Sequence, residues 1–204
     1  MATGNEVYNL IITGVGGQGN VLSSQLIGQA FVAKGYFVTI GETYGSSQRG
    51  GSVMSHIRIS SKKQLGPLIP KGKADIIIGL EPVEALRILT TYGNPKTVVL
   101  ANTRPIYPIG VTSGEEKYPE SGEIQGALKE LSRQYYSVPA TEKAMEMGPP
   151  ILGNMIMIGA LLELDLLPLT AAEFRKTLAK NFNAKRLETN LQALQEGQRI
   201  VRSA

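Results

Sequence analysis

A glycine-rich run at residues 14–19 carries the first pattern that could do chemistry, the binding of a phosphate. The run reads GVGGQG, and three of its glycines fit the G-x-G-x-x-G fingerprint between a predicted strand and a predicted helix. Glycines let the backbone approach a phosphate closely, and the following helix N-terminus offers free N–H groups and a partial positive charge. The candidate contacts are Gly14, Gly16, Gly17, Gln18 and Gly19. Glu42 lies where the dinucleotide fingerprint places an acidic residue for the ribose, so this run alone suggests an NAD-binding dehydrogenase.

A second glycine-rich segment, residues 41–53, follows the next predicted strand and reads GETYGSSQRGGSV. Its hydroxyls and Arg49 suit a phosphate or a carboxylate, because a guanidinium can bind either group through two parallel hydrogen bonds. The candidate contacts here are Thr43, Ser47, Gln48 and Arg49. The alternative is a glycine turn that only redirects the chain, with Arg49 in solvent. No lysine follows the last glycine, so the segment is not a Walker A loop.

Three further polar residues each have a chemical and a structural interpretation. His56 could act as a general base, but its place beside Arg58 in an alternating strand favours a structural role. Asn102 follows a predicted strand, where open α/β sheets bind ligands, and a turn asparagine is the alternative. Asn154 is expected to cap an apolar helix, with a role facing a partner as the alternative. No catalytic residue is assigned by these patterns.

The composition limits the other kinds of chemistry. The 204 residues include no cysteine and one histidine, so we expect no disulfide, no thiolate-held cluster and no bound metal. The net charge of +4 combines basic ends with an acidic middle, which suits a phosphate-bearing ligand and equally suits ordinary surface charge. We expect neither nucleic-acid nor membrane binding, because basic tracts interleaved with aromatic residues and apolar runs of roughly 20 residues are missing. A cytoplasmic location is the simplest interpretation of a sequence without cysteine or a visible signal peptide.

Apolar periodicity predicts the elements that must position these loops. Short apolar or β-branched runs predict strands, while helical spacing and the capping pair Thr170 and Glu173 predict helices. The expected strands are residues 7–13, 36–40, 53–59, 75–79, 97–100 and 135–138. The expected helices are residues 20–34, 82–90, 124–132, 151–162, one that begins after Thr170, and 183–201, with residues 101–122 mainly loop. This alternation predicts an α/β fold: a single domain over residues 1–204, with three α/β/α layers, a mostly parallel sheet and a helical C-terminal quarter.

Several segments together resemble the gamma-type domain of the 2-oxoacid:ferredoxin oxidoreductase family, and in particular the beta subunits of its indolepyruvate branch. The segments GVGGQGNVLSSQLIGQA and GETYGSSQRGGSVMSHIRIS carry most of the resemblance. It continues through DIIIGLEPVEALR, VVLANTRPIYP and GNMIMIGALLEL, and so covers most of the chain. The paired glycine loops are far more specific than either loop alone.

This resemblance implies an oxidoreductase that works as part of a complex. The family oxidatively decarboxylates a 2-oxoacid with coenzyme A (CoA), which yields an acyl-CoA, carbon dioxide and reduced ferredoxin, and the indolepyruvate branch acts on arylpyruvates. Thiamine diphosphate and iron–sulfur clusters are expected in a larger partner subunit, in agreement with the absence of cysteine and of a GDG-type thiamine motif here. The two glycine loops are implied contacts for CoA phosphates or substrate. An NAD(P)-dependent dehydrogenase domain and a non-catalytic nucleotide-binding module remain open as alternatives.

Overall fold

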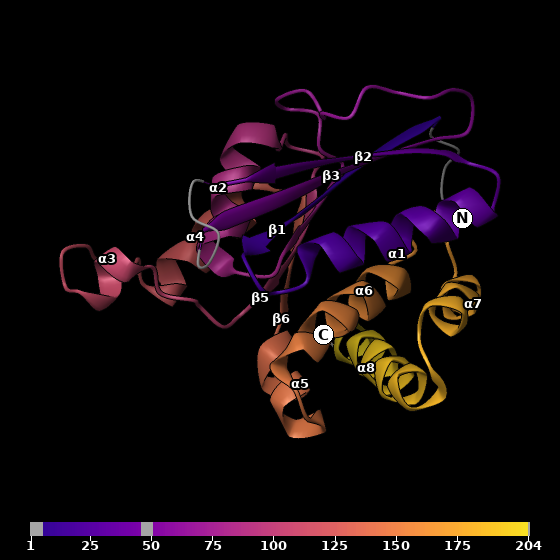
Figure 1. Ribbon diagram of the computed structural model, residues 1–204. Coiled ribbons are helices and arrows are strands. Elements are labelled where there is room, and N and C mark those ends of the chain that lie inside the picture. The colour runs from indigo at the N-terminus through magenta and orange to yellow at the C-terminus, as the bar shows by residue number, and fades with distance from the viewer. Residues whose placement is uncertain (1–5, 46–50, 204) are drawn as a thin grey trace.

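The computed structural model describes residues 6–45 and 51–203, which form a six-stranded sheet flanked by helices (Figure 1). The strand order is β2-β3-β1-β4-β5-β6. The strands are β1 (Val7–Val15), β2 (Phe37–Tyr44), β3 (Ser52–Ser60), β4 (Ile76–Gly79), β5 (Val98–Asn102) and β6 (Gln134–Val138). The helices are α1 (Asn20–Ala33), α2 (Pro82–Tyr92), α3 (Ile109–Thr112), α4 (Ser121–Leu131), α5 (Ala140–Met147), the short 3-10 helix η1 (Pro150–Leu152), α6 (Gly153–Glu163), α7 (Ala171–Asn181) and α8 (Ala184–Arg202).

The sheet is mostly parallel, as predicted. Strands β1, β4, β5 and β6 pair in parallel, and β3 runs antiparallel between β1 and β2. Helices connect the parallel strands, whereas β2 and β3 are neighbours in sequence and too close along the chain for the crossover that a parallel pair would need. Because β3 opposes both of its neighbours, β2 points in the same direction as β1.

Helices cover both faces of the sheet, which confirms the predicted three-layer α/β arrangement. Helices α1, α6, α7 and α8 lie on one face, and α2 and α4 on the other (Figure 1). Side chains on β1 alternate between the two layers, since Leu10 and Ile12 belong to the first core and Ile11 to the second. The predicted helical C-terminal quarter is also confirmed, and it forms much of the larger core.

Helix α6 is buried along almost its whole length, in contact with α8 on its outer side. Every residue from 153 to 162 is buried. The backbones of α6 and α8 touch where two glycines face the opposite helix. A Cβ atom on Gly159 would overlap the carbonyl of Leu194, and one on Gly197 would overlap the carbonyl of Ile156. Only glycine permits this approach, so these two residues set the distance between the helices.

The predicted elements are all present, with differences mainly at their ends. The capping box of Thr170 and Glu173 forms at the start of α7 as expected. Within the predicted loop at residues 101–122, the short helix α3 forms. Asn154 does not cap α6, because η1 runs directly into that helix and Leu152 occupies the cap position. In the described part of the chain, no helix combines the length and the apolar character needed to cross a membrane.

Candidate functional site

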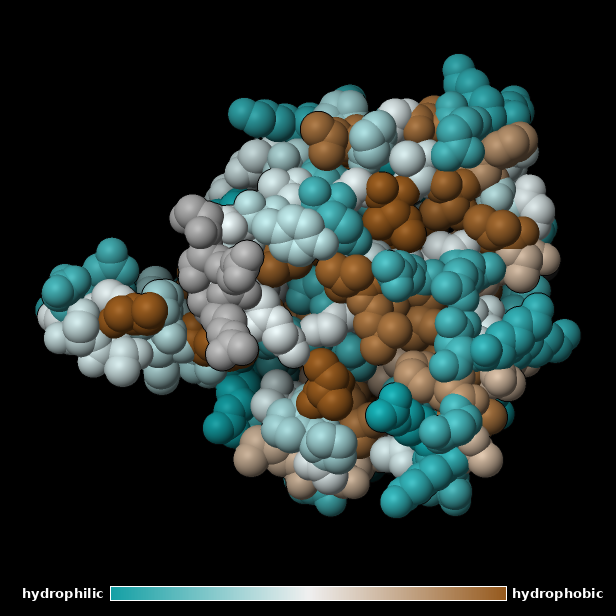
Figure 2. Space-filling view, in the orientation of Figure 1, coloured by the Kyte–Doolittle hydropathy of each residue, from teal (hydrophilic) through white to brown (hydrophobic). Residues whose placement is uncertain are grey.

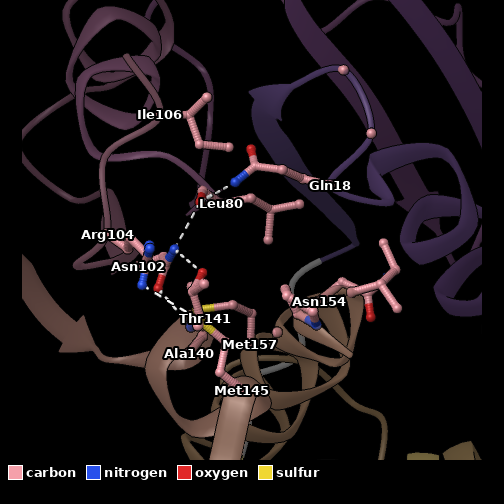
Figure 3. A pocket seen from close by; sticks show the side chains of 15 residues that line it. Gln18, Leu80, Asn102, Arg104, Ile106, Ala140, Thr141, Met145, Asn154 and Met157 are labelled. Atoms are coloured by element: carbon pink, nitrogen blue, oxygen red, sulfur yellow. Dashed lines mark hydrogen bonds between the residues drawn. The ribbon is translucent and has the colours of Figure 1, made fainter. Parts of the chain in front are cut away.

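A cavity of about 470 Å³ opens at the carboxyl ends of β1, β4 and β5 (Figure 3). The chain leaves β1 toward one side of the sheet and β4 toward the other, so the cavity lies at the point where the strand order reverses. Open α/β sheets bind ligands at this point. The lining residues come from the glycine loop, the ends of β4 and β5, and the segment α5–α6: Gly16, Gly17, Gln18, Leu80, Asn102, Arg104, Ile106, Ala140, Thr141, Met145, Pro150, Ile151, Gly153, Asn154 and Met157.

The glycines of the first loop divide into two groups. Gly16 and Gly17 line the cavity, and Gly17 has a positive φ of 100°, which favours glycine. Gly14 lies within β1, where a Cβ atom would come within 2.9 Å of the Leu80 Cβ. Gly19 is the N-cap of α1 with a φ of 88°, and a side chain there would overlap the Asn154 amide. Gly14 and Gly19 therefore shape the loop, and Gly16 and Gly17 present backbone to the cavity.

The side chain of Gln18 stabilises the conformation of the glycine loop through two hydrogen bonds to backbone groups. Its Oε1 accepts the Val15 N–H at 2.7 Å, and its Nε2 donates to the Leu80 carbonyl at 2.8 Å. Both ends of the amide are thus bonded to the backbone of β1 or of the residue after β4. Gln18 lines the cavity, and these two bonds fix the shape of the loop, while its contact with a cofactor stays a prediction.

Asn102 joins the same Leu80 carbonyl from the end of β5. Its Nδ2 donates to that carbonyl at 3.0 Å and to the Thr141 hydroxyl at 2.8 Å, while its Oδ1 accepts the Thr141 N–H at 3.1 Å (Figure 3). One buried carbonyl therefore links the glycine loop and β5, and Asn102 extends the link to α5. The expectation that Asn102 lies near a ligand site at a strand end agrees with its place in the cavity wall.

Three helices begin at the wall of this cavity. Residues at or next to the N-termini of α1, α5 and α6 line it, and none of these helices has a hydrogen bond from the side chain of its own N-cap residue. Two first-turn N–H groups are already bonded, since Thr141 N–H of α5 donates to Asn102 and Gly153 N–H of α6 donates to carbonyls of η1. A helix N-terminus carries a partial positive charge and unpaired N–H groups, which stabilise an anion. The partial positive charges of three helix ends therefore converge on this wall.

Arg104 and Asn154 add two polar side chains to the same wall. The Arg104 Nη1 lies 3.4 Å from the Met145 sulfur, and no carboxylate of the described residues forms an ion pair with it. Asn154 is 5% exposed and lines the cavity. An amide at a cavity wall can form hydrogen bonds to a ligand atom or to water. Sequence patterns did not point to Arg104, because it follows β5 in a segment expected to be loop.

The second predicted loop is described only at its ends. Thr43 is exposed near the end of β2, opposite Met54 on β3, and it does not line the cavity. Ser47, Gln48 and Arg49 lie outside the described residues. The Gly16 N–H donates to the Gly51 carbonyl at 3.0 Å, so the two glycine segments meet at that point.

Glu42 does not occupy the position of a ribose-binding acid in a dinucleotide domain. Its two carboxylate oxygens accept the hydroxyls of Ser24 at 2.8 Å and Ser55 at 2.6 Å. In addition, β3 separates β2 from β1, whereas the dinucleotide fold pairs these strands directly. The geometry thus argues against the dehydrogenase alternative.

His56 is a buried structural residue, as favoured by its place in the strand. It is 1% exposed, and its Nδ1 accepts the Ile69 N–H at 3.3 Å. Burial lowers its pKa below 6.5, and the nearby Arg58 charge lowers the pKa further. His56 does not line the cavity, so its imidazole is not placed to act on a ligand there.

The fold and the cavity define a three-layer α/β protein with a cavity at its strand-order reversal. The model of the pyruvate ferredoxin/flavodoxin oxidoreductase family matches residues 9–200. The chain is 39% identical to the indolepyruvate oxidoreductase subunit IorB of Archaeoglobus fulgidus over 93% of this chain and 92% of that protein. This chain therefore belongs to the pyruvate ferredoxin/flavodoxin oxidoreductase family, and its predicted identity as a small subunit of a 2-oxoacid:ferredoxin oxidoreductase is confirmed.

Solved structures share the fold at lower sequence identity. The 2-oxoglutarate:ferredoxin oxidoreductase of Magnetococcus marinus, solved with 2-oxoglutarate, coenzyme A and succinyl-CoA bound, matches with a TM-score of 0.76 and 22% identity. The match covers 98% of this chain and 32% of that longer chain. The keto/oxoacid ferredoxin oxidoreductase gamma subunit of Geobacter sulfurreducens matches with a TM-score of 0.69 and 18% identity, over 97% of this chain and 99% of that one.

Proposed function

We propose that this chain serves an oxidoreductase that converts indolepyruvate and related arylpyruvates with CoA to the acyl-CoA, carbon dioxide and reduced ferredoxin. The near full-length similarity to an indolepyruvate oxidoreductase subunit supports the choice of substrate. Iron–sulfur clusters, which would supply electron transfer, belong in a larger partner because this chain has no cysteine. Thiamine diphosphate, which would supply decarboxylation, belongs there too, because this chain has no GDG-type thiamine motif. We place the complex in the cytoplasm, together with ferredoxin.

The task of this chain in that reaction is to hold CoA by its phosphates. The observation that carries this proposal is the convergence of three helix N-termini with Arg104 and Asn154 on one cavity. The N–H groups would bind phosphate oxygens, and the Arg104 guanidinium would add a charge-assisted hydrogen bond. Apolar side chains on the same wall, among them Ile106 and Met157, suit the pantetheine arm of CoA and exclude water from it.

Among the candidate contacts from the sequence, Gly17 would present its backbone N–H to the phosphates, and Gly16, whose N–H is bonded to Gly51, would let them approach closely. Gln18 would hold the loop in shape through its bonds to Val15 and Leu80. Arg49, with Ser47 and Gln48, stays a proposed contact for a second anion. No residue of this chain is assigned to proton transfer, so its proposed contribution is binding and orientation.

The test is steady-state kinetics on the complex formed with the larger subunit, with arylpyruvate-dependent reduction of a viologen dye under anaerobic conditions. Loss of one charge-assisted hydrogen bond costs about 1.5 kcal/mol, so Arg104→Ala should raise the KM for CoA about tenfold. The KM for arylpyruvate should stay the same. Arg133→Ala is a matched control, because Arg133 is exposed and does not line the cavity.

Each outcome has a distinct meaning. An unchanged KM for CoA in the Arg104 variant would remove the phosphate site from this cavity. A raised KM for arylpyruvate instead would assign the cavity to the substrate carboxylate. A wild-type complex that reduces the dye with pyruvate or 2-oxoglutarate, and not with arylpyruvates, would refute the substrate assignment.

A further inference from the structure

Residues 103–119 form an arm that projects from the body of the protein. The arm leaves the sheet after β5, carries α3, and returns at the start of α4 (Figure 1). Three large apolar side chains on it are exposed: Ile109 at 83%, Tyr107 at 57% and Ile106 at 40%. Figure 2 shows apolar surface on this lobe, set among hydrophilic side chains. An apolar residue exposed at the tip of a projecting element gains nothing from the fold of its own chain.

The arm is held in shape by its own contacts. The rings of Tyr107 and Tyr118, one from each limb, meet edge to face with centroids 5.0 Å apart. At the tip, the Gly110 carbonyl accepts the N–H groups of Glu115 and Glu116, each at 2.9 Å. These bonds close the turn after α3, so the exposed side chains sit on an ordered frame.

Both segments of the arm, the one that leaves β5 and the one that returns to α4, also contact the buried carboxylate of Glu81. Glu81 is 2% exposed and caps α2 by accepting the Glu84 N–H at 2.8 Å. The Tyr118 hydroxyl from the returning limb donates to it, and the Ile106 backbone N–H from the leaving limb lies near enough to favour its charged form. Burial raises the pKa of Tyr118 well above 10, so its hydroxyl stays a proton donor at physiological pH. The carboxylate fixes the direction in which the arm projects.

We propose that this arm is the element that docks onto the larger, thiamine- and cluster-binding subunit. The inference rests on the proposed function, which supplies that partner. Ile106 joins the arm to the cavity, since it lines the cavity and also the hollow under the arm. A partner that covers the arm would therefore also lie at the mouth of the proposed CoA site.

The arm indicates the chemistry of the surface that receives it. Ile109 and Tyr107 need an apolar pocket, because burial of such side chains provides most of the energy of an interface. Glu115 and Glu116 on the returning limb are exposed, and so is the neighbouring Lys117. The receiving surface should thus combine an apolar pocket with a polar rim that offers a basic group to the two glutamates.

The experiment measures the affinity of the purified chain for the purified larger subunit. Ile109→Asp should weaken binding by about tenfold or more, because it places a charge at the centre of the apolar contact. Aspartate is favourable in the first turn of a helix, so α3 should persist. Leu68→Asp is the matched control: Leu68 is 58% exposed and lies outside the arm, in the segment between β3 and β4, where its carbonyl accepts a hydrogen bond from Arg58 on β3. Its affinity should equal that of the wild type.

Tyr118→Phe is a second variant that leaves the exposed side chains unchanged. Loss of the hydroxyl should increase amide hydrogen exchange in residues 106–118 and weaken binding less than Ile109→Asp does. Equal affinities for Ile109→Asp, Leu68→Asp and the wild type would overturn the inference. The inference would also be overturned if Ile109→Asp lost self-association of this chain and kept its affinity for the larger subunit, because the arm would then bind a second copy. The proposed function is judged separately by whether the wild-type complex oxidises arylpyruvates.

Discussion

Replacing Asn102 with alanine should lower the free energy of unfolding by about 2–3 kcal/mol. The substitution removes three hydrogen bonds, to the Leu80 carbonyl and to the hydroxyl and N–H of Thr141. Each such bond contributes roughly 0.5–1.5 kcal/mol net, so the loss lies at about 1.5–4.5 kcal/mol. The Leu80 carbonyl keeps its bond from Gln18, and water in the adjoining cavity can reach the Thr141 N–H. Neither group is left without a partner, which places the estimate in the lower half of that range.

The assay is urea denaturation followed by far-ultraviolet circular dichroism, with Thr103→Val as the control. Thr103 is the next residue and also bridges to α5, through a single 3.2 Å bond to Glu142 in a half-buried position. Its loss should cost under about 1 kcal/mol. Equal losses for the two variants, or a loss under about 1 kcal/mol for Asn102→Ala, would show that the linkage through Leu80 does not stabilise the fold.

Three other perturbations have outcomes that follow from contacts and titrating groups. Gly159→Ala should destabilise the protein by about 3 kcal/mol in the same urea titration, because the new Cβ would overlap the backbone of α8. Gly126→Ala on α4 is the control: its Cβ would meet nothing within 4 Å, and the substitution should stabilise the protein by about 0.5 kcal/mol. Hydrogen bonding from Lys34 lowers the pKa of Glu173 to about 2. The free energy of unfolding of wild type should therefore exceed that of Glu173→Gln by about 0.5 kcal/mol above pH 4.5, and this difference should disappear as the pH falls toward 2. A difference that does not change with pH would contradict this prediction. The pKa of buried His56 is lowered, so as the pH falls the imidazole is protonated in the unfolded chain before it is protonated in the folded protein. Wild type should therefore lose stability relative to His56→Gln as the pH falls below 6.5. Parallel pH profiles of stability for the two proteins would contradict this prediction.

Local patterns were enough to predict the layers of this fold. The strands carry short apolar runs, and glycine, proline and the capping box mark where helices start and end. The ends of elements were less predictable. Asn154 was expected to cap α6, but η1 precedes that helix and leaves the asparagine inside its first turn, facing the cavity. Whether a residue lies at a cap or one position later depends on the preceding turn, which sequence spacing does not specify.

The candidate site was only partly predictable, because half of it comes from segments far apart in sequence. The glycine loop could be identified from its own residues, and Asn102 from its place after a strand. The opposite wall, with Arg104, Thr141 and Asn154, forms only when α5 and α6 pack at the end of the sheet. The antiparallel insertion of β3 likewise depends on long-range pairing, and it is what separates this fold from a dinucleotide-binding one.

The glycine contact between α6 and α8 has a consequence for how the protein is made in the cell. Helix α8 contributes no residue to the cavity, yet it covers α6, which forms part of the cavity wall. During synthesis, residues 184–202 emerge from the ribosome after everything else that surrounds the cavity. Until then, the apolar outer side of α6 has no cover, and a nascent chain presents it to chaperones. A chain that stalls before α8 would carry every residue that lines the cavity and still lack the helix that covers α6, so the wall of the cavity is fully supported only after α8 has been translated and has packed.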